Sequence, residues 1–185
     1  MTIKQFSIKG YSPFGWQFDG DGFVFKAYKG DNRIVGSNHD DYLKGNRGDD
    51  VLNGGAGNDL LSGGDGRNVL KGGAGADTFM FFGNIDAVDR ICDFSSKAGD
   101  KIALGTEVIF DKLEKAAPHT EFISALAKSN FVIGKSAKDA DDRIVYDKDT
   151  GALSYDADGN GAGAVVQFAC LKAGTALSAS DFYLF

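Results

Sequence analysis

The sequence predicts an all-β fold whose first half is a stack of short, glycine-rich repeats. Glycine makes up 26 of the 185 residues and is crowded between residues 36 and 75, whereas proline occurs only 2 times. Through this stretch a single large apolar residue recurs every nine residues, and an Asp or Asn stands two positions before it. A fixed period of this length is typical of repeat architectures in which each unit buries its apolar residue against its neighbours.

The register of the repeat is unambiguous. Written in nines from Gly36, the chain reads GSNHDDYLK, GNRGDDVLN, GGAGNDLLS, GGDGRNVLK and GGAGADTFM, and the preceding AYKGDNRIV keeps the same register. Position 8 holds Ile34, Leu43, Leu52, Leu61, Leu70 and Phe79. Position 6 holds Asn32, Asp41, Asp50, Asp59, Asn68 and Asp77. The even spacing of position 8 predicts one inward-facing apolar ladder.

The polar positions of the repeat predict cation sites between the turns. Paired strands lie about 4.8 Å apart, and calcium lies about 2.4 Å from its oxygen ligands. An ion that touches two stacked turns therefore fits the coil spacing. We expect position-6 side chains of alternate repeats to face the same ion, and turn carbonyls to complete its shell. The candidate glycines are Gly36, Gly45, Gly48, Gly54, Gly55, Gly57, Gly63, Gly64, Gly66, Gly72, Gly73 and Gly75.

The nonapeptide resembles the calcium-binding RTX repeat, G-G-x-G-x-D-x-U-x. The chain is therefore similar to the C-terminal part of hemolysin-type RTX proteins, such as the serralysins, which bacteria export by type I secretion. The resemblance implies a calcium-loaded parallel β-roll, in which each repeat supplies a turn and a short strand, two repeats make one coil, and about three to five calcium ions bind. Without metal, acidic turns would stack with nothing between them, so binding and folding are expected to be coupled.

The two edges of the roll are predicted to differ. Odd and even repeats lie on opposite edges, so Asp41, Asp59 and Asp77 share the first edge. Asn32, Asp50 and Asn68 share the second edge. Because an Asn offers a neutral oxygen where an Asp offers a charged carboxylate, we expect strong sites on the first edge and weaker sites around Asp50.

The segment after the repeats extends the resemblance. It reads DTFMFFGNIDAVDRICDFSSKAGDKIAL, and the serralysin-type proteases follow their roll with a similar D-T-F-x-F, D-x-I-x-D-F and D-K-I pattern. In that family the first Asp of D-x-I-x-D-F and the Asp of D-K-I help to bind a calcium ion at the end of the roll. The resemblance assigns these roles to Asp89 and Asp100.

The remainder predicts an antiparallel β-rich region with one short helix. EFISALAKS, residues 121–129, has the pattern of an amphipathic helix. Residues 144–155 alternate around a turn at 148–151 and predict a hairpin, and residues 164–170 predict a strand. The DADGNG segment lacks the Glu of an EF-hand loop and is interpreted as a turn. The apolar end of the chain resembles the uncleaved C-terminal signal of type I secretion substrates.

Three segments are expected. Residues 1–26 are rich in aromatic residues and either cap the roll or form the tail of a preceding domain. Residues 27–104 form the roll, and residues 105–185 form the C-terminal region. We expect His39, which replaces a turn glycine, not to be a metal ligand, and we favour two separate buried thiols at Cys92 and Cys170 over a disulfide.

Composition and motifs limit the possible functions. The net charge is -6, which argues against a nucleic-acid partner. No apolar run could span a membrane, and the N-terminus lacks the apolar region of a Sec signal. No zinc-protease or serine-hydrolase motif occurs, and only 2 histidines are present, so we expect a chain that is not an enzyme.

The leading hypothesis is a calcium-dependent folding and export module. The expected partner is the ABC exporter complex of type I secretion, and the expected location is extracellular. One alternative is a polysaccharide-binding module similar to the R-modules of secreted mannuronan epimerases, with Lys44, Arg47, Arg67 and Lys71 as candidate contacts. Another is an accessory domain of a secreted hydrolase or protease whose catalytic part is absent.

Overall fold

The computed structural model describes residues 4–7, 23–27, 29–82, 85, 87–105 and 124–185. This part of the chain is almost entirely β-structure, and its helical segments are two short 3-10 turns, η1 (Lys128–Asn130) and η2 (Ala179–Asp181). No helix among the described residues has the length and apolar character needed to cross a membrane. The predicted all-β class is confirmed.

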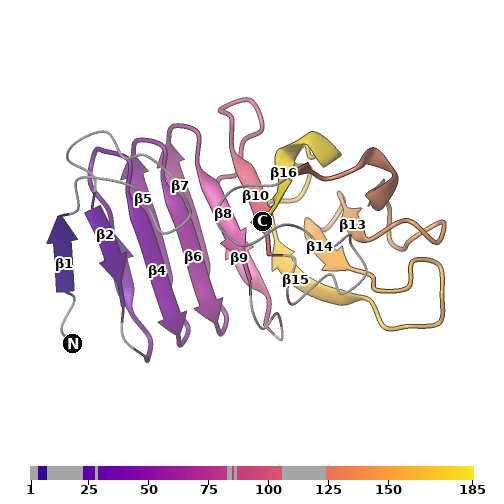
Figure 1. The fold of residues 1–185 in the computed structure, drawn as a ribbon, viewed down its shortest axis with the longest axis horizontal. Coiled ribbons are helices and arrows are strands. Elements are labelled where there is room, and N and C mark those ends of the chain that lie inside the picture. The colour runs from indigo at the N-terminus through magenta and orange to yellow at the C-terminus, as the bar shows by residue number, and fades with distance from the viewer. Residues whose placement is uncertain (1–3, 8–22, 28, 83–84, 86, 106–123) are drawn as a thin grey trace.

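The strands form two sheets that face each other across one core (Figure 1). The first sheet has the order β1 (Lys4–Ser7), β2 (Phe23–Lys26), β4 (Tyr42–Arg47), β6 (Leu60–Asp65), β8 (Thr78–Phe81), β10 (Lys101–Leu104), β16 (Phe182–Leu184) and β11 (Ser124–Ala125). The second sheet has the order β12 (Phe131–Ile133), β13 (Ile144–Asp147), β14 (Ala152–Tyr155), β15 (Val166–Cys170), β9 (Asp89–Ile91), β7 (Val69–Ala74), β5 (Val51–Ala56) and β3 (Arg33–Val35). From β2 to β10, successive strands alternate between the two sheets, as a β-roll requires.

Within the repeats the strands pair in parallel with a register of two repeats. Leu43 of β4 lies opposite Leu61 of β6, and Leu52 of β5 lies opposite Leu70 of β7. One full coil therefore takes two nonapeptides. The predicted parallel β-roll is confirmed.

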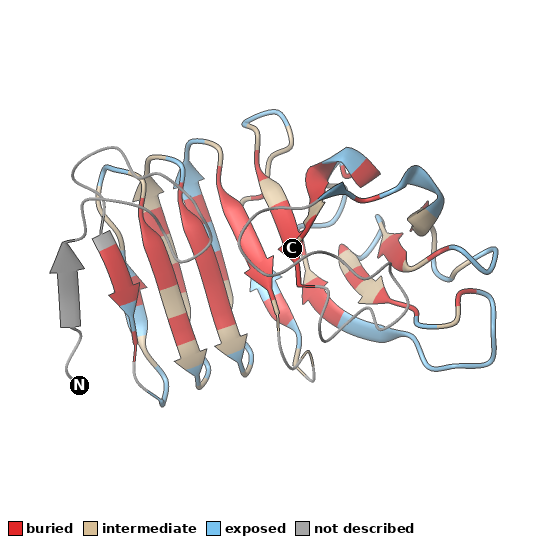
Figure 2. Cartoon of the chain, viewed as in Figure 1, coloured by how far each residue is buried: buried red, intermediate tan, exposed pale blue. Residues whose placement is uncertain are grey.

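The register places the apolar residues of each sheet in a buried ladder (Figure 2). In the first sheet the ladder is Phe25, Leu43, Leu61, Phe79, Ile102 and Phe182. In the second sheet it is Ile34, Leu52, Leu70 and Ile91. The ladders extend past the last recognisable repeat, because strands of the C-terminal half continue the same stacking.

The C-terminal region adds strands to both sheets of the roll. β16 pairs in parallel with β10, and β15 pairs in parallel with β9. The predicted hairpin is present, with Ile144 opposite Tyr155 and Tyr146 opposite Leu153. The predicted strand at 164–170 is observed as β15. All of these elements contribute to one apolar cluster that begins at Phe25 and ends at Leu184.

The predicted helix over residues 121–129 is wrong where the structure describes it. Ser124 and Ala125 form β11, which pairs antiparallel with Leu184 and Tyr183 of β16, and a 3-10 turn follows at Lys128. Pairing with the sheet edge satisfies the backbone here, so the helical pattern of the side chains does not decide the structure. Residues 121–123 lie outside the described residues.

Two other expectations have partial outcomes. Cys92 and Cys170 are free thiols, as favoured, but both are half-buried instead of fully buried. Of the N-terminal aromatic residues, Phe25 is buried in the core. The aromatic residues between positions 8 and 22 lie outside the described residues, so the capping role of this segment stays a prediction.

Candidate metal centre

The turns of the roll depend on glycine at positions 2 and 4 of the repeat. Gly55 and Gly57, which hold these positions in one turn, have φ values of 118° and 116°. Backbone in this left-handed region is accessible to glycine without steric cost. Position 2 of another turn holds Asn46 with φ 72°, and Asn is among the few residues that tolerate this conformation.

Position 1 of the repeat is glycine for a different reason, which is space. A Cβ added to Gly54 would collide with Oδ2 of Asp59 and with the carbonyl oxygen of Gly72 in the next coil. A carboxylate oxygen and a carbonyl oxygen therefore converge beside the glycine. The same convergence with an Asp Oδ2 and a next-coil carbonyl recurs at Gly36 and Gly45.

The position-6 side chains join neighbouring coils on the first edge. The backbone N–H of Asp41 donates to Oδ1 of Asp59 at 2.8 Å, and the N–H of Asp59 donates to Oδ1 of Asp77 at 2.9 Å. The N–H of Asp77 donates to Oδ1 of Asp100 at 3.0 Å. Asp100 therefore extends the first edge by one coil, and its calcium role stays a prediction.

The second edge is built in the same way. The backbone N–H of Asn32 donates to Oδ1 of Asp50 at 2.7 Å, and the N–H of Asp50 donates to Oδ1 of Asn68 at 3.0 Å. The N–H of Asn68 donates to Oδ1 of Asp89 at 2.9 Å. Asp89 is thus the fourth member of the second edge. All of these position-6 groups except Asn32 are buried.

Three carboxylate oxygens in the turns have no partner. Oδ2 of Asp50, Asp59 and Asp77 is buried and accepts no hydrogen bond. A buried, unpaired carboxylate oxygen beside a carbonyl oxygen is unfavourable unless a cation lies between them. No three His, Cys, Asp or Glu side chains of the described residues converge on one point. A bound cation would therefore need backbone carbonyls as well as carboxylates, which is the ligand set that calcium accepts.

The pKa values of the buried carboxyl groups also favour a bound cation. Burial, aided by the neighbouring charges of Asp77 and Asp41, raises the pKa of Asp59 to about 8. Burial likewise raises the pKa of Asp89 to about 7 and that of Asp77 to about 6. Ionised carboxylates are thus disfavoured in these positions unless a cation neutralises them.

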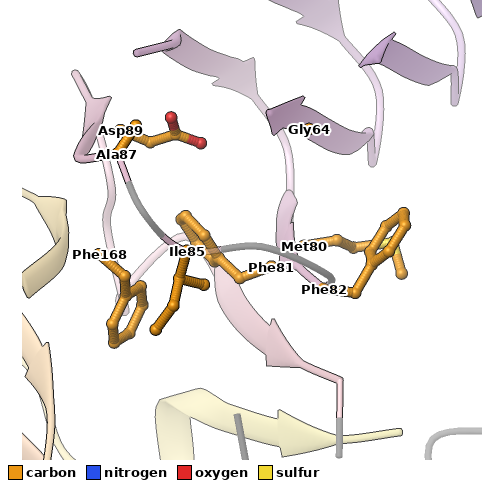
Figure 3. A pocket seen from close by; sticks show the side chains of 8 residues that line it. All are labelled: Gly64, Met80, Phe81, Phe82, Ile85, Ala87, Asp89 and Phe168. Atoms are coloured by element: carbon orange, nitrogen blue, oxygen red, sulfur yellow. The ribbon is translucent and has the colours of Figure 1, made fainter. Parts of the chain in front are cut away.

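Asp89 lies in the least regular part of the site. Its carboxylate stands on one wall of a small cavity that Phe81, Ile85 and Phe168 also line, and it points toward Gly64 (Figure 3). This coil is longer than the regular ones, since Asn68 and Asp89 are 21 residues apart whereas Asp50 and Asn68 are 18 residues apart. The coil nevertheless returns to the same register.

A second ladder, at position 5, escaped the sequence analysis. The N–H of Asp49 donates to Oδ1 of Asp31 at 2.9 Å, and the N–H of Ala76 donates to Oδ1 of Asn58 at 2.8 Å. The available signal was an Asp or Asn at position 5 of four consecutive repeats, namely Asp31, Asp40, Asp49 and Asn58. Asp31, Asp49 and Asn58 are exposed and Asp40 is half-buried, and these side chains link the same coils from outside the metal positions.

Asp93 contacts the last repeat turn from the coil that follows it. The carboxylate of Asp93, which was not singled out, accepts hydrogen bonds from the N–H groups of Gly72 and Gly73, each at 3.0 Å. It therefore fixes the last repeat turn from the following coil.

His39 is exposed, and its N–H donates to Oγ of Ser37 at 3.1 Å. It belongs to no group of potential metal ligands among the described residues.

Comparison with known proteins supports the repeat identification. Residues 27–61 and 53–81 match the model of the RTX calcium-binding nonapeptide repeat, which comprises 4 copies. No curated protein sequence matches the chain. Among solved structures, the chain is similar to the AlgE6R3 subunit from the Azotobacter vinelandii mannuronan C5-epimerase, with 28% sequence identity and a TM-score of 0.51. The similarity covers 83% of this chain and 78% of that subunit.

Proposed function

Because residues 27–81 are RTX calcium-binding nonapeptide repeats, we propose that the chain is a non-catalytic module that folds when it binds calcium and is exported by type I secretion. The observation that carries the calcium-dependent part is the set of buried, unpartnered Oδ2 atoms of Asp50, Asp59 and Asp77. Each represents a free-energy cost that a bound cation would remove.

The ligands of the proposed sites come from two neighbouring coils. Oδ2 of Asp59 and the carbonyl oxygen of Gly72 would contribute to one site, and Oδ2 of Asp50 and the carbonyl oxygen of Gly63 to another. Asp77 would contribute with Asp100 at the end of the first edge. Calcium suits these positions because it accepts six to eight oxygen ligands in flexible geometry, whereas magnesium requires a tighter octahedron and retains its waters.

Binding and folding would be the same event in this module. The chain carries a net charge of -6, and about three calcium ions would offset it. In the absence of calcium, the buried carboxyl groups of Asp59 and Asp77 on the first edge have raised pKa values. A chain at low cytosolic calcium would therefore stay largely unfolded and would fold at millimolar calcium outside the cell.

The export role is supported by the C-terminal sequence. The ASDFYLF segment, residues 179–185, resembles the uncleaved signal of type I secretion substrates, and an exporter of that class requires an unfolded chain. The RTX repeat itself is the second support, because it is typical of substrates of this route. The partner in this proposal is the ABC exporter complex, and the final location is extracellular.

Circular dichroism tests the calcium-dependent part directly. The far-UV spectrum should show a largely unfolded chain in chelator and a β-rich chain at millimolar calcium, and magnesium at the same concentration should not replace calcium. Identical spectra with and without calcium would contradict the proposal. Export is tested separately, by secretion of the full chain from cells that carry a type I exporter compared with cells that lack it.

A second candidate function is binding of an anionic polysaccharide. The similar subunit belongs to a mannuronan C5-epimerase, and mannuronan is a carboxylated polymer. The first sheet carries a groove lined by Lys29, Lys44, Arg47 and Phe82 among others. Nζ of Lys44 lies 4.8 Å from the centre of the Phe82 ring, and burial together with the nearby Lys26 lowers the pKa of Lys44.

Only part of the predicted basic set is in this groove. Lys44 and Arg47 line it, whereas Lys71 belongs to β7 of the second sheet and Arg67 to the turn before it.

Affinity electrophoresis in mannuronan, with neutral dextran as the reference gel, tests the binding of an anionic polysaccharide. Retardation that Lys44→Ala weakens and Lys71→Ala does not would support it. Equal mobility of all three proteins in both gels would contradict it.

A further inference from the structure

We propose that no calcium ion binds between the Asn68 side chain and the following coil at Asp89, because the side-chain amide nitrogen of Asn68 occupies the place that the ion would take. This inference rests on the proposed calcium-binding function and assigns which turns of the roll perform it. It goes further than the expectation of a weak site, since it predicts that the place beside the Asn68 amide holds no ion at all.

The contacts of the Asn68 amide carry the inference. Nδ2 donates to Oδ1 of Asp89 at 2.9 Å and to the carbonyl oxygens of Gly64 and Gly66, each at 3.3 Å. Oδ1 of Asn68 accepts the backbone N–H of Asp50 at 3.0 Å. Because only the oxygen can accept from that N–H, the amide orientation is fixed by the backbone of the preceding coil.

The same place in the Asp turns is held by an oxygen without a partner. Measured from the position-1 glycine, Nδ2 of Asn68 stands beside Gly63 as Oδ2 of Asp59 stands beside Gly54 and Oδ2 of Asp77 beside Gly72. The two Asp oxygens are buried and unpaired, whereas the Asn68 nitrogen has three acceptors. An amide donor and a cation satisfy the same carbonyl and carboxylate oxygens, so one excludes the other.

The pattern extends along the second edge. Nδ2 of Asn32 donates to Oδ1 of Asp50 at 3.1 Å, as Nδ2 of Asn68 does to Asp89. The second edge therefore alternates amide and carboxylate, and each amide is paired with the carboxylate of the next coil. Among the described residues of this edge, the buried side-chain oxygen without a hydrogen-bond partner is Oδ2 of Asp50, which lies close to the carbonyl oxygen of Gly63. We infer one ion for the second edge, at Asp50, while the carboxylates of the first edge require the others.

Counting bound calcium in matched variants tests the inference. Native mass spectrometry of the full chain at saturating calcium gives the number of ions retained. Asn68→Asp removes the amide donor and adds a carboxylate, so it should retain one ion more than the wild type. Asn68→Ala removes the amide without adding a ligand, so it should retain the wild-type number and need more calcium to fold. Asn53→Asp, which adds the same charge on strand β5 outside the turns, should leave the count unchanged.

The outcomes separate this inference from the proposed function. A wild-type chain that retains no calcium overturns the proposed function and the inference with it. A wild-type chain that binds calcium but loses one ion in Asn68→Ala overturns the inference alone, because Asn68 is then a ligand. An unchanged count in a folded Asn68→Asp also overturns it. If Asn68→Asp does not fold, the count of Asn68→Ala decides.

Discussion

The backbone N–H of Asp59 donates to Oδ1 of Asp77 in the next coil at 2.9 Å, while Oδ2 of Asp77 is buried without a hydrogen-bond partner. The two oxygens of one carboxylate therefore have different roles. Oδ1 joins adjacent coils through a hydrogen bond, and Oδ2 is the atom that would bind a cation under the proposed function. Asp59 and Asp50 repeat this division.

Asp59→Ala should destabilise the calcium-loaded chain much more than Asp50→Ala. Asp59 lies between two carboxylates of the first edge, Asp41 and Asp77, and its loss should damage the sites on both sides. A site whose Kd is 100-fold below the calcium concentration contributes about 2.7 kcal/mol, so two such sites contribute on the order of 5 kcal/mol. Asp50 has Asn neighbours on its edge, and a site near half saturation contributes only a few tenths of a kcal/mol.

Urea unfolding at millimolar calcium measures the difference between these two variants. Calorimetric titration with calcium should show the corresponding loss of strong sites in Asp59→Ala alone. If Asp50→Ala proves as harmful, the turn carbonyls dominate binding and the two edges are equivalent.

The metal-free chain should gain stability as the pH falls. The folded-state pKa values of Asp59, Asp89 and Asp77, at about 8, 7 and 6, are raised above the unfolded value, chiefly by burial. Raised carboxyl pKa values destabilise the folded state at high pH, and this penalty decreases as the pH falls from about 8 to the unfolded pKa of about 4. Far-UV circular dichroism of calcium-free protein should therefore show more β-structure at pH 5 than at pH 8.

Calcium binding should respond to pH in the opposite sense. Protons compete with calcium for these oxygens only where the unfolded carboxyl groups also titrate, so the calcium concentration at the folding midpoint should rise as the pH falls below about 5, towards the unfolded pKa of about 4. Asp59→Asn is the matched variant, because it keeps an Oδ1 acceptor and removes the titrating group. Its metal-free form should be more folded at pH 8 than the wild type. A calcium midpoint that does not rise between about pH 6 and pH 4 would count against carboxylate ligands.

Gly54→Ala should weaken both folding and calcium binding. The added methyl group would collide with Oδ2 of Asp59 and with the backbone carbonyl of Gly72, and overpacking of this kind costs roughly 1–3 kcal/mol. Gly134→Ala is the control, because a Cβ there has no heavy atom closer than 3.7 Å. Thermal unfolding in calcium should separate the two variants clearly, and equal midpoints would show that the turn is less crowded than the structure indicates.

Phe182→Ala should destabilise the roll although it lies more than 100 residues after the repeats. Phe182 is fully buried opposite Ile102 and ends the apolar ladder of the first sheet, and truncation of a buried Phe typically costs about 3–5 kcal/mol. Val166→Ala, at a half-exposed position of β15, should cost far less. Urea midpoints in calcium decide this, and a wild-type midpoint for Phe182→Ala would mean that β16 is dispensable for the roll.

The repeat determined most of what could be predicted from the sequence. A nine-residue period fixes the inward position of Leu43 and Leu61 and the turn position of Asp59, because parallel stacking leaves no freedom of register. Where the period ends, the prediction depended on resemblance alone. Asp89 and Asp100 nevertheless complete the second and first edges.

Long-range pairing explains what the sequence could not predict. The pairing of β16 with β10 joins residues 80 positions apart, as in Ile102 and Phe182, and no local pattern encodes it. Ser124 and Ala125 become a strand because the edge of β16 is available to them, against their helical pattern. The position of the Asn68 amide between three acceptors is likewise visible only once the coils are stacked.

The burial of β16 makes folding and export mutually exclusive states under the proposed function. The segment that resembles the export signal lies between β10 and β11, its Phe182 and Leu184 side chains are buried, and Asp181 accepts a hydrogen bond from Oγ of Ser96 at 2.6 Å. An exporter could bind this segment only while the chain is unfolded. A chain that folded inside the cell would bury the segment and could not be exported. A chain that folds outside the cell buries it as well and cannot be bound again, so transport in this scheme has a single direction.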